Sequence, residues 1–161
     1  MKGLLLLLAL CLFPGTAFAR SVVSLPAARN LTPDCVADAA LAHGVPLAAL
    51  MGILAAEGGR EGEAKLNANG SWDMGPFQVN TCNLNELVLQ GFTPEAILLD
   101  GCINAHAAAW ILHREYARAR NIWTAIGAYH SRTPQLSAAY AARVKQHLAR
   151  MGGLWPDGAR Q

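Results

Sequence analysis

The chain has 161 residues, and its formal net charge at pH 7 is only +2. That charge does not indicate a nucleic-acid-binding protein, although it permits approach to an anionic polymer such as cell-wall glycan. The length suits one domain with an ordinary core, and beyond the N-terminal leader no apolar segment is long enough to cross a membrane.

Residues 1–19 have the organisation of a secretory signal peptide. Lys2 supplies a positive start, residues 4–13 form an apolar run, and Ala17-Phe18-Ala19 has the small-x-small pattern of a signal-peptidase site. The run has about ten residues, whereas a bilayer requires roughly 20. We therefore expect cleavage after Ala19 and export to the periplasm. We expect no lipidation of Cys11, because Leu10 stands directly before it, where a lipoprotein signal would have a small residue.

The sequence after the leader predicts a series of helices. Thr32 can cap a helix with Pro33 at its first position, and Gly44 can end it. A second helix is predicted from near residue 46 to Glu57, since apolar residues recur at helical spacing and a glycine pair follows. Glu57 therefore lies at the C-terminal end of an apolar helix.

The rest of the chain predicts a single, mostly α domain with one small β element. Residues 65–80 are rich in turn-forming residues and predict a hairpin or an extended loop. Helical patterns follow over residues 84–90, 94–99, 103–118, 122–129 and 136–151, the last with a stripe of Tyr140, Val144, Leu148 and Met151. We place the domain at residues 20–151 and a loose tail at 152–161.

Three cysteines remain in the predicted mature chain, namely Cys35, Cys82 and Cys102. An odd number in an oxidising compartment predicts one disulfide with a leftover thiol, or an intermolecular bond. None of the spacings is that of close zinc ligands, so no metal site is expected.

Glu57 is the strongest candidate for acid–base chemistry. Burial by the apolar residues before it and the negative pole of its helix both raise the pKa of such a carboxyl. A protonated carboxyl near neutral pH can act as a general acid. The alternative from this feature alone is an ordinary exposed glutamate in a C-terminal turn.

The residues that follow carry a family resemblance. The string Asn69-Gly70-Ser71-Trp72-Asp73-Met74-Gly75-Pro76-Phe77-Gln78-Val79-Asn80, downstream of a helix-end glutamate, resembles the goose-type lysozyme and lytic transglycosylase (SLT) superfamily. Within it, the subgroup associated with type IV secretion and conjugation is most similar, together with type III invasion-associated enzymes. The segments 81–84, 100–104 and 127–131 extend the resemblance over most of the mature chain.

The resemblance implies a lysozyme-like α+β fold whose helical lobe and β hairpin flank a peptidoglycan groove, with no cofactor. It makes Glu57 the catalytic acid and implies that Tyr129 steadies it by a hydrogen bond. The implied substrate-binding residues are Asp73, Gly75, Phe77, Gln78, Asn80, Tyr129 and His130. It also implies a Cys35–Cys102 disulfide, with Cys82 as the odd thiol.

Two positions depart from the family pattern. Gly58 stands where the family usually has a serine, and His130 stands where it has an asparagine. Neither change removes Glu57 or Tyr129, so activity is still expected.

The resemblance implies that Glu57 cleaves the β-1,4 bond between N-acetylmuramic acid and N-acetylglucosamine without water and leaves a 1,6-anhydro ring. The expected purpose is local opening of the wall for a secretion or conjugation apparatus. One alternative is a retaining hydrolase that uses Asp73 as the second carboxylate. Another is a glycan-binding assembly factor without catalysis.

A basic cluster remains outside this scheme. Arg114, Arg118 and Arg120 lie close together in a predicted helix and its end. They can attract an anionic glycan, but a solvated helix end explains them equally well.

Overall fold

Seven α-helices and a three-stranded sheet make up residues 28–152, the part of the chain that the computed structural model describes. The predicted signal peptide and the tail beyond Gly152 lie outside these residues. The helices are α1 (Pro33–Ala42), α2 (Leu47–Glu57), α3 (Leu84–Leu89), α4 (Pro94–Leu99), α5 (Gly101–Ala119), α6 (Ile122–His130) and α7 (Pro134–Arg150). The strands are β1 (Ala64–Leu66), β2 (Trp72–Met74) and β3 (Val79–Asn80), and a 3₁₀ turn, η1 (Thr81–Asn83), follows them.

The predicted helix signals are confirmed at most boundaries. The Thr32 hydroxyl accepts a hydrogen bond from the Cys35 amide at 3.2 Å and so caps α1. Helix α5 begins before the predicted residue 103, because Asp100 Oδ1 accepts from the Cys102 and Ile103 amides at 2.8 and 3.0 Å.

The stripe predicted along the last helix is correct except at its end. Tyr140, Val144 and Leu148 are buried on α7, but Met151 is 41% exposed. Met151 is the C-cap residue, beyond the last helical turn, and it therefore leaves the packed face. Helix α7 also begins two residues earlier than predicted, with Pro134 in its first turn.

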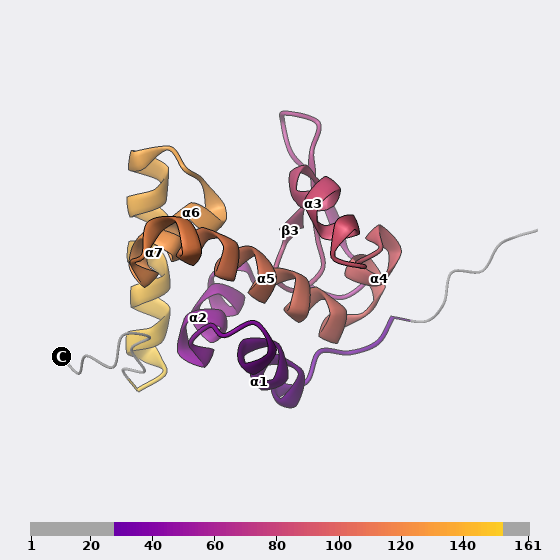
Figure 1. Cartoon of the computed structure of the whole chain (residues 1–161), viewed down its shortest axis with the longest axis horizontal. Helices are drawn as coiled ribbons and strands as arrows, with labels where there is room; N and C mark the ends of the chain where they lie inside the picture. The colour runs from indigo at the N-terminus through magenta and orange to yellow at the C-terminus, as the bar shows by residue number, and fades with distance from the viewer. Residues whose placement is uncertain (1–27, 153–161) are drawn as a thin grey trace, which may run out of the picture.

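Helix α5 is the central element of the fold. Figure 1 shows it crossing the middle of the molecule, with α6 and α7 on one side and α4 on the other. Helices α1, α4 and α6 pack against it, and α7 packs against α2 and α6. The close packing depends on small side chains, because four alanines of α5 have no exposed surface: Ala105, Ala107, Ala108 and Ala109.

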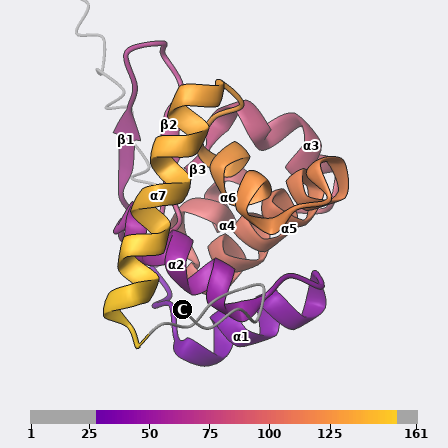
Figure 2. The ribbon, with the colours of Figure 1, turned by 90° about the vertical axis from the view of Figure 1, so that its left-hand side faces the viewer.

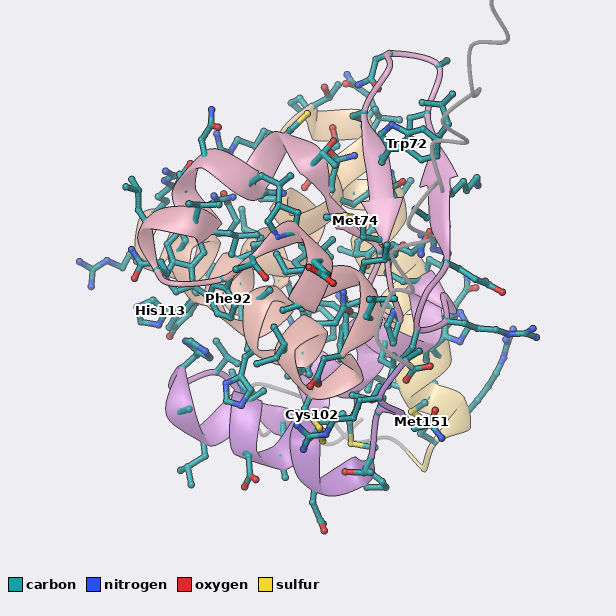
Figure 3. All side chains as sticks on the ribbon, turned by 90° about the vertical axis from the view of Figure 1, so that its right-hand side faces the viewer. Trp72, Met74, Phe92, Cys102, His113 and Met151 are labelled. Atoms are coloured by element: carbon teal, nitrogen blue, oxygen red, sulfur yellow. A yellow bond between two sulfur atoms is a disulfide. The ribbon has the colours of Figure 1, made fainter. Side chains whose placement is uncertain are left out.

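The sheet forms a hairpin at the opposite end of the molecule from α1 (Figures 1 and 2). Strand β2 pairs antiparallel with both β1 and β3, and its Asp73 lies opposite Lys65 and Asn80. Side chains alternate between the faces of a strand, so the neighbouring pair, Leu66 and Trp72, lies on the other face. Trp72 is 43% exposed, and Figure 3 shows it on the hairpin.

A disulfide links Cys35 in α1 to Cys102 at the start of α5, across 67 residues of sequence. Figure 3 shows this sulfur–sulfur bond beside the Cys102 label. The expected pairing is therefore confirmed, and the chain-entropy model assigns a loop of this length about 4 kcal/mol of stabilisation. Cys82 is a free, exposed thiol.

The described part of the chain is a mostly helical domain with a small antiparallel sheet, as predicted. Among residues 28–152, no helix combines the length and the apolar character needed to cross a bilayer. The same residues contain no group of three or more side chains suited to hold a metal ion.

Candidate active site

A groove of about 860 Å³ runs between the hairpin and the helices. The C-terminal ends of α2 and α6 contribute to its walls, together with β1, β2, η1 and parts of α3, α5 and α7. Six of the predicted site residues line it: Glu57, Asp73, Gln78, Asn80, Tyr129 and His130.

Glu57 occupies the last position of α2, and its carboxyl faces this groove. Burial raises its pKa above the ordinary glutamate value, and the nearby Asp73 charge acts in the same direction. A hydrogen bond from Tyr140 and the charge of Arg143 oppose the shift without cancelling it. The raised pKa inferred from the apolar helix is therefore present in the folded chain, and it favours the protonated carboxyl that a general acid needs.

The hydrogen bond to Glu57 comes from a different tyrosine than expected. Tyr140 Oη donates to Glu57 Oε1 at 2.6 Å, whereas Tyr129 Oη donates to the Phe77 carbonyl at 2.9 Å. The expectation that Tyr129 bonds Glu57 directly is wrong, because α7 packs against α2 and brings Tyr140 to the carboxyl. Tyr129 instead ties α6 to the segment beneath the groove.

In the sequence, Tyr140 is recognisable only as a member of the apolar stripe along the last helix. A buried tyrosine hydroxyl requires a hydrogen-bond partner, and Tyr140 is only 3% exposed. Its position in an apolar stripe was therefore a usable sign that a polar group lies opposite.

His130 and Arg143 both contact the Tyr140 ring. The His130 ring stacks on it with centroids 4.8 Å apart and planes within 4°, and Arg143 Cζ lies 4.9 Å from its centroid. Burial and the charge of Arg143 lower the pKa of His130, which favours a neutral imidazole. His130 therefore supports the ring that holds Glu57, which gives a physical role to this departure from the family pattern.

Asp73 is held rigidly in the groove wall. Asn80 Nδ2 donates to its Oδ1 at 2.7 Å, and Asn67 Nδ2 donates to its Oδ2 at 2.9 Å. Both amides also donate to the Ser71 hydroxyl, at 2.9 and 3.2 Å, which links the hairpin into one network. Charge-assisted hydrogen bonds of this kind fix a carboxylate in one orientation.

Gly75 and Phe77 lie beneath the groove and do not line it. Phe77 has no exposed surface, so its side chain packs in the core, and its place in substrate binding stays a prediction. Gly75 has a φ of +68°, and a Cβ there would come within 2.5 Å of the Asn104 side-chain nitrogen. Both residues support the groove and are buried because the chain folds back onto α5 at this point.

Asn104 is the buried group that organises this support, and no motif in the sequence marks it. Its Oδ1 accepts from the Phe77 amide at 2.8 Å, and its Nδ2 donates to the Met74 and Ile97 carbonyls at 2.9 Å each. One fully buried side chain on α5 thus satisfies three backbone groups of the segments around it.

We expect Asn104→Ala to destabilise the chain by about 2–4 kcal/mol, because a buried amide and two carbonyls lose their partner. Urea unfolding followed by circular dichroism measures the loss. Asn85→Ala is the matched control, since Asn85 is exposed on α3. Equal stabilities of the two variants would contradict the role assigned to Asn104.

Gln78 and Gly58 adopt left-handed backbone conformations at the catalytic end of the groove. Gln78 has a φ of +49°, and its side-chain nitrogen donates to the Gly75 carbonyl at 2.8 Å. Gly58 has a φ of +62° and donates its amide to the Leu54 carbonyl, which ends α2 directly after Glu57. A glycine adopts this conformation without the steric cost that a Cβ brings.

The geometry is that of a lysozyme-like domain with a partly buried carboxyl in a groove, and the chain belongs to the transglycosylase SLT domain family. That family's model matches residues 34–148, which include Glu57, the hairpin and Tyr140. Among characterised proteins, the chain is similar to Protein IpgF of Shigella flexneri, with 30% identity over 101 residues, 62% of this chain and 66% of that protein. It is also similar to Invasion protein IagB of Salmonella typhimurium, with 27% identity over 92 residues, 55% of this chain and 58% of that protein. The matched region thus spans less than two thirds of the length of each of these relatives.

Proposed function

We propose that this chain is a lytic transglycosylase that cleaves the β-1,4 bond between N-acetylmuramic acid and N-acetylglucosamine in peptidoglycan. The observation that carries the proposal is the state of the Glu57 carboxyl. It lies in the groove of a transglycosylase domain, and burial raises its pKa. One carboxyl in this state can act first as an acid and then as a base.

In the first step, protonated Glu57 donates its proton to the glycosidic oxygen as the bond to the muramyl C1 breaks. The muramyl acetamido group can stabilise the positive charge that develops at C1. In the second step, the Glu57 carboxylate accepts the proton of the muramyl 6-hydroxyl, whose oxygen bonds to C1. The product is a 1,6-anhydro ring, no water is consumed, and Glu57 returns to its protonated form.

Tyr140 and Arg143 assist the first step in particular, because it leaves Glu57 ionised. The hydrogen bond from Tyr140 and the positive charge of Arg143 both stabilise the ionised form of Glu57. They therefore limit the rise in its pKa that burial causes. A carboxyl that must give up and regain one proton works best with a pKa between the extremes.

A second candidate function is hydrolysis, which the fixed carboxylate of Asp73 favours. Asn67 and Asn80 orient Asp73 in the same groove as Glu57. In a retaining hydrolase, a second carboxylate about 5 Å from the acid attacks or stabilises the anomeric carbon. Under the transglycosylase proposal, Asp73 binds the sugar and supplies no nucleophile.

We further propose that the chain acts in the periplasm, where it opens the wall locally for a secretion or conjugation apparatus. The signal-peptide pattern of residues 1–19 and the Cys35–Cys102 disulfide support export to an oxidising compartment. One similar protein is named Invasion protein IagB, and this name supports a role connected with invasion.

The masses of the released fragments test the reaction. We expect wild-type protein to release fragments with anhydromuramyl ends from purified sacculi, and to incorporate no oxygen from ¹⁸O-labelled water. Asp73→Asn should still form anhydro ends, because the transglycosylase route needs no second carboxylate. Two results together would instead establish the hydrolase. Wild-type protein would release reducing ends that carry ¹⁸O, and Asp73→Asn would lower their yield by more than about 10²-fold.

A further inference from the structure

Outside the catalytic residues, one part of the groove contains a buried carboxylate that three arginines surround. Glu115 on α5 is 3% exposed. Its Oε1 lies 2.7 Å from Arg132 Nη2, 3.0 Å from Arg114 Nη2 and 3.1 Å from Arg118 Nη1. We call Glu115 and these three arginines the arginine cluster.

The arginine cluster retains positive charge after its internal pairs are formed. Burial tends to raise the pKa of Glu115, but the hydrogen bond from Arg132 and the charge of Arg114 outweigh burial and bring the pKa below its usual range. Glu115 is therefore ionised at neutral pH. Glu86 supplies a second negative charge, 3.1 Å from Arg114, so three arginines face two carboxylates and one positive charge remains.

The arginines differ in what they can offer a ligand. Arg114 is 13% exposed and is already engaged by Glu86, Glu115 and the Asn83 side chain, which accepts from its Nη2 at 2.8 Å. Arg118 does not line the groove. Arg132 lines the groove, and its side chain is 61% exposed.

Glu115 holds Arg132 in one orientation. Arg132 donates from Nε to Glu115 Oε2 at 3.2 Å and from Nη2 to Oε1 at 2.7 Å, a two-point contact along one edge of the guanidinium. Its third nitrogen, Nη1, makes no hydrogen bond within residues 28–152. A guanidinium already fixed by a buried partner loses little freedom on binding a second carboxylate, which favours recognition.

We propose that Arg132, positioned by Glu115, binds a carboxylate on the peptide arm of peptidoglycan, so that the groove prefers peptide-bearing strands. This inference rests on the proposed function. In an intact strand the acetylated sugars are neutral and the muramyl lactyl group is in an amide bond, so the free carboxylates lie on the peptide. Arg114 also lines the groove but is already engaged, and the remaining cations there, Lys65 and Arg143, lie near Glu57 and serve the site already described.

The test measures binding of two matched ligands by isothermal titration calorimetry. One is a soluble peptide-bearing muropeptide tetrasaccharide, and the other is the same molecule with its peptide carboxylates converted to methylamides. The parent protein is the full mature chain with Glu57→Gln, which stops cleavage during the titration. We expect the parent to bind the carboxylate form about tenfold more tightly than the amidated form.

Arg132→Gln should remove this preference by weakening only the carboxylate form, about tenfold. Arg118→Gln is the matched control, because it removes a second Glu115 partner outside the groove and should keep the preference. Arg132→Lys should restore part of it, since the charge returns without the two-point contact. Thermal unfolding of each variant verifies that it folds.

Two outcomes would overturn the inference. One is equal affinity of the parent for both ligands, and the other is an equal loss of preference in Arg118→Gln and Arg132→Gln. The failure of the parent to bind either ligand would count against the glycan groove itself, and with it the proposed function. Binding of both ligands with equal affinity would therefore exclude the carboxylate preference of Arg132 and leave the proposed transglycosylase function standing.

Discussion

Glu57→Gln is expected to lower the rate of peptidoglycan cleavage by about 10³-fold or more, while the fold and glycan binding persist. A glutamine amide cannot donate an acidic proton to the leaving oxygen, and general acid–base catalysis contributes about 10²–10⁴-fold. Because Glu57 serves as acid and then as base, both steps of the proposed reaction lose their proton carrier. Release of dye-labelled fragments from sacculi measures the rate.

The substitution is well suited to this test because it conserves shape and the local hydrogen bond. The Tyr140 hydroxyl that now donates to Glu57 Oε1 can donate to the glutamine oxygen in the same way. Glu63→Gln provides the control, since Glu63 is exposed and lies outside the groove. If Glu57→Gln were folded and cleaved sacculi at the wild-type rate, the assignment of the catalytic acid would be excluded.

The sequence was sufficient to find Glu57 because the signs that mark it are local. Glu57 is the last residue of an apolar helix, and the glycine that follows ends the helix at that point. The same applies to Thr32, whose capping bond connects residues three positions apart. Where both partners lie within one turn, residue type and order predict the contact.

The missed features depend on contacts between distant segments. The Tyr140–Glu57 bond joins residues 83 apart, and Asn104 contacts backbone groups up to 30 residues away. Periodicity assigns Tyr140 to a buried face, but only the packing of α7 against α2 decides which polar group that face meets. The Cys35–Cys102 pairing is also long-range, and it came from the family resemblance and not from spacing.

Tyr140→Phe is expected to lower the maximal cleavage rate by about 10–10²-fold and to move the alkaline limb of the pH–rate profile to higher pH. The rate loss follows from the hydrogen bond that fixes the Glu57 carboxyl and stabilises it when it is ionised. The direction of the pH shift follows from the same bond. It lowers the pKa of Glu57, so its loss lets that pKa rise further, and the carboxyl stays protonated to higher pH.

Arg143→Gln separates the charge effect from the positioning effect. Arg143 also lowers the pKa of Glu57, but through its charge and without a hydrogen bond to the carboxyl. Its removal should therefore move the alkaline limb in the same direction with a smaller loss of maximal rate.

Phenylalanine retains the ring that His130 stacks on, so a lower rate in Tyr140→Phe cannot be assigned to lost packing of that ring. A Tyr140→Phe profile that loses rate with an unmoved alkaline limb would show that Tyr140 does not control the ionisation of Glu57.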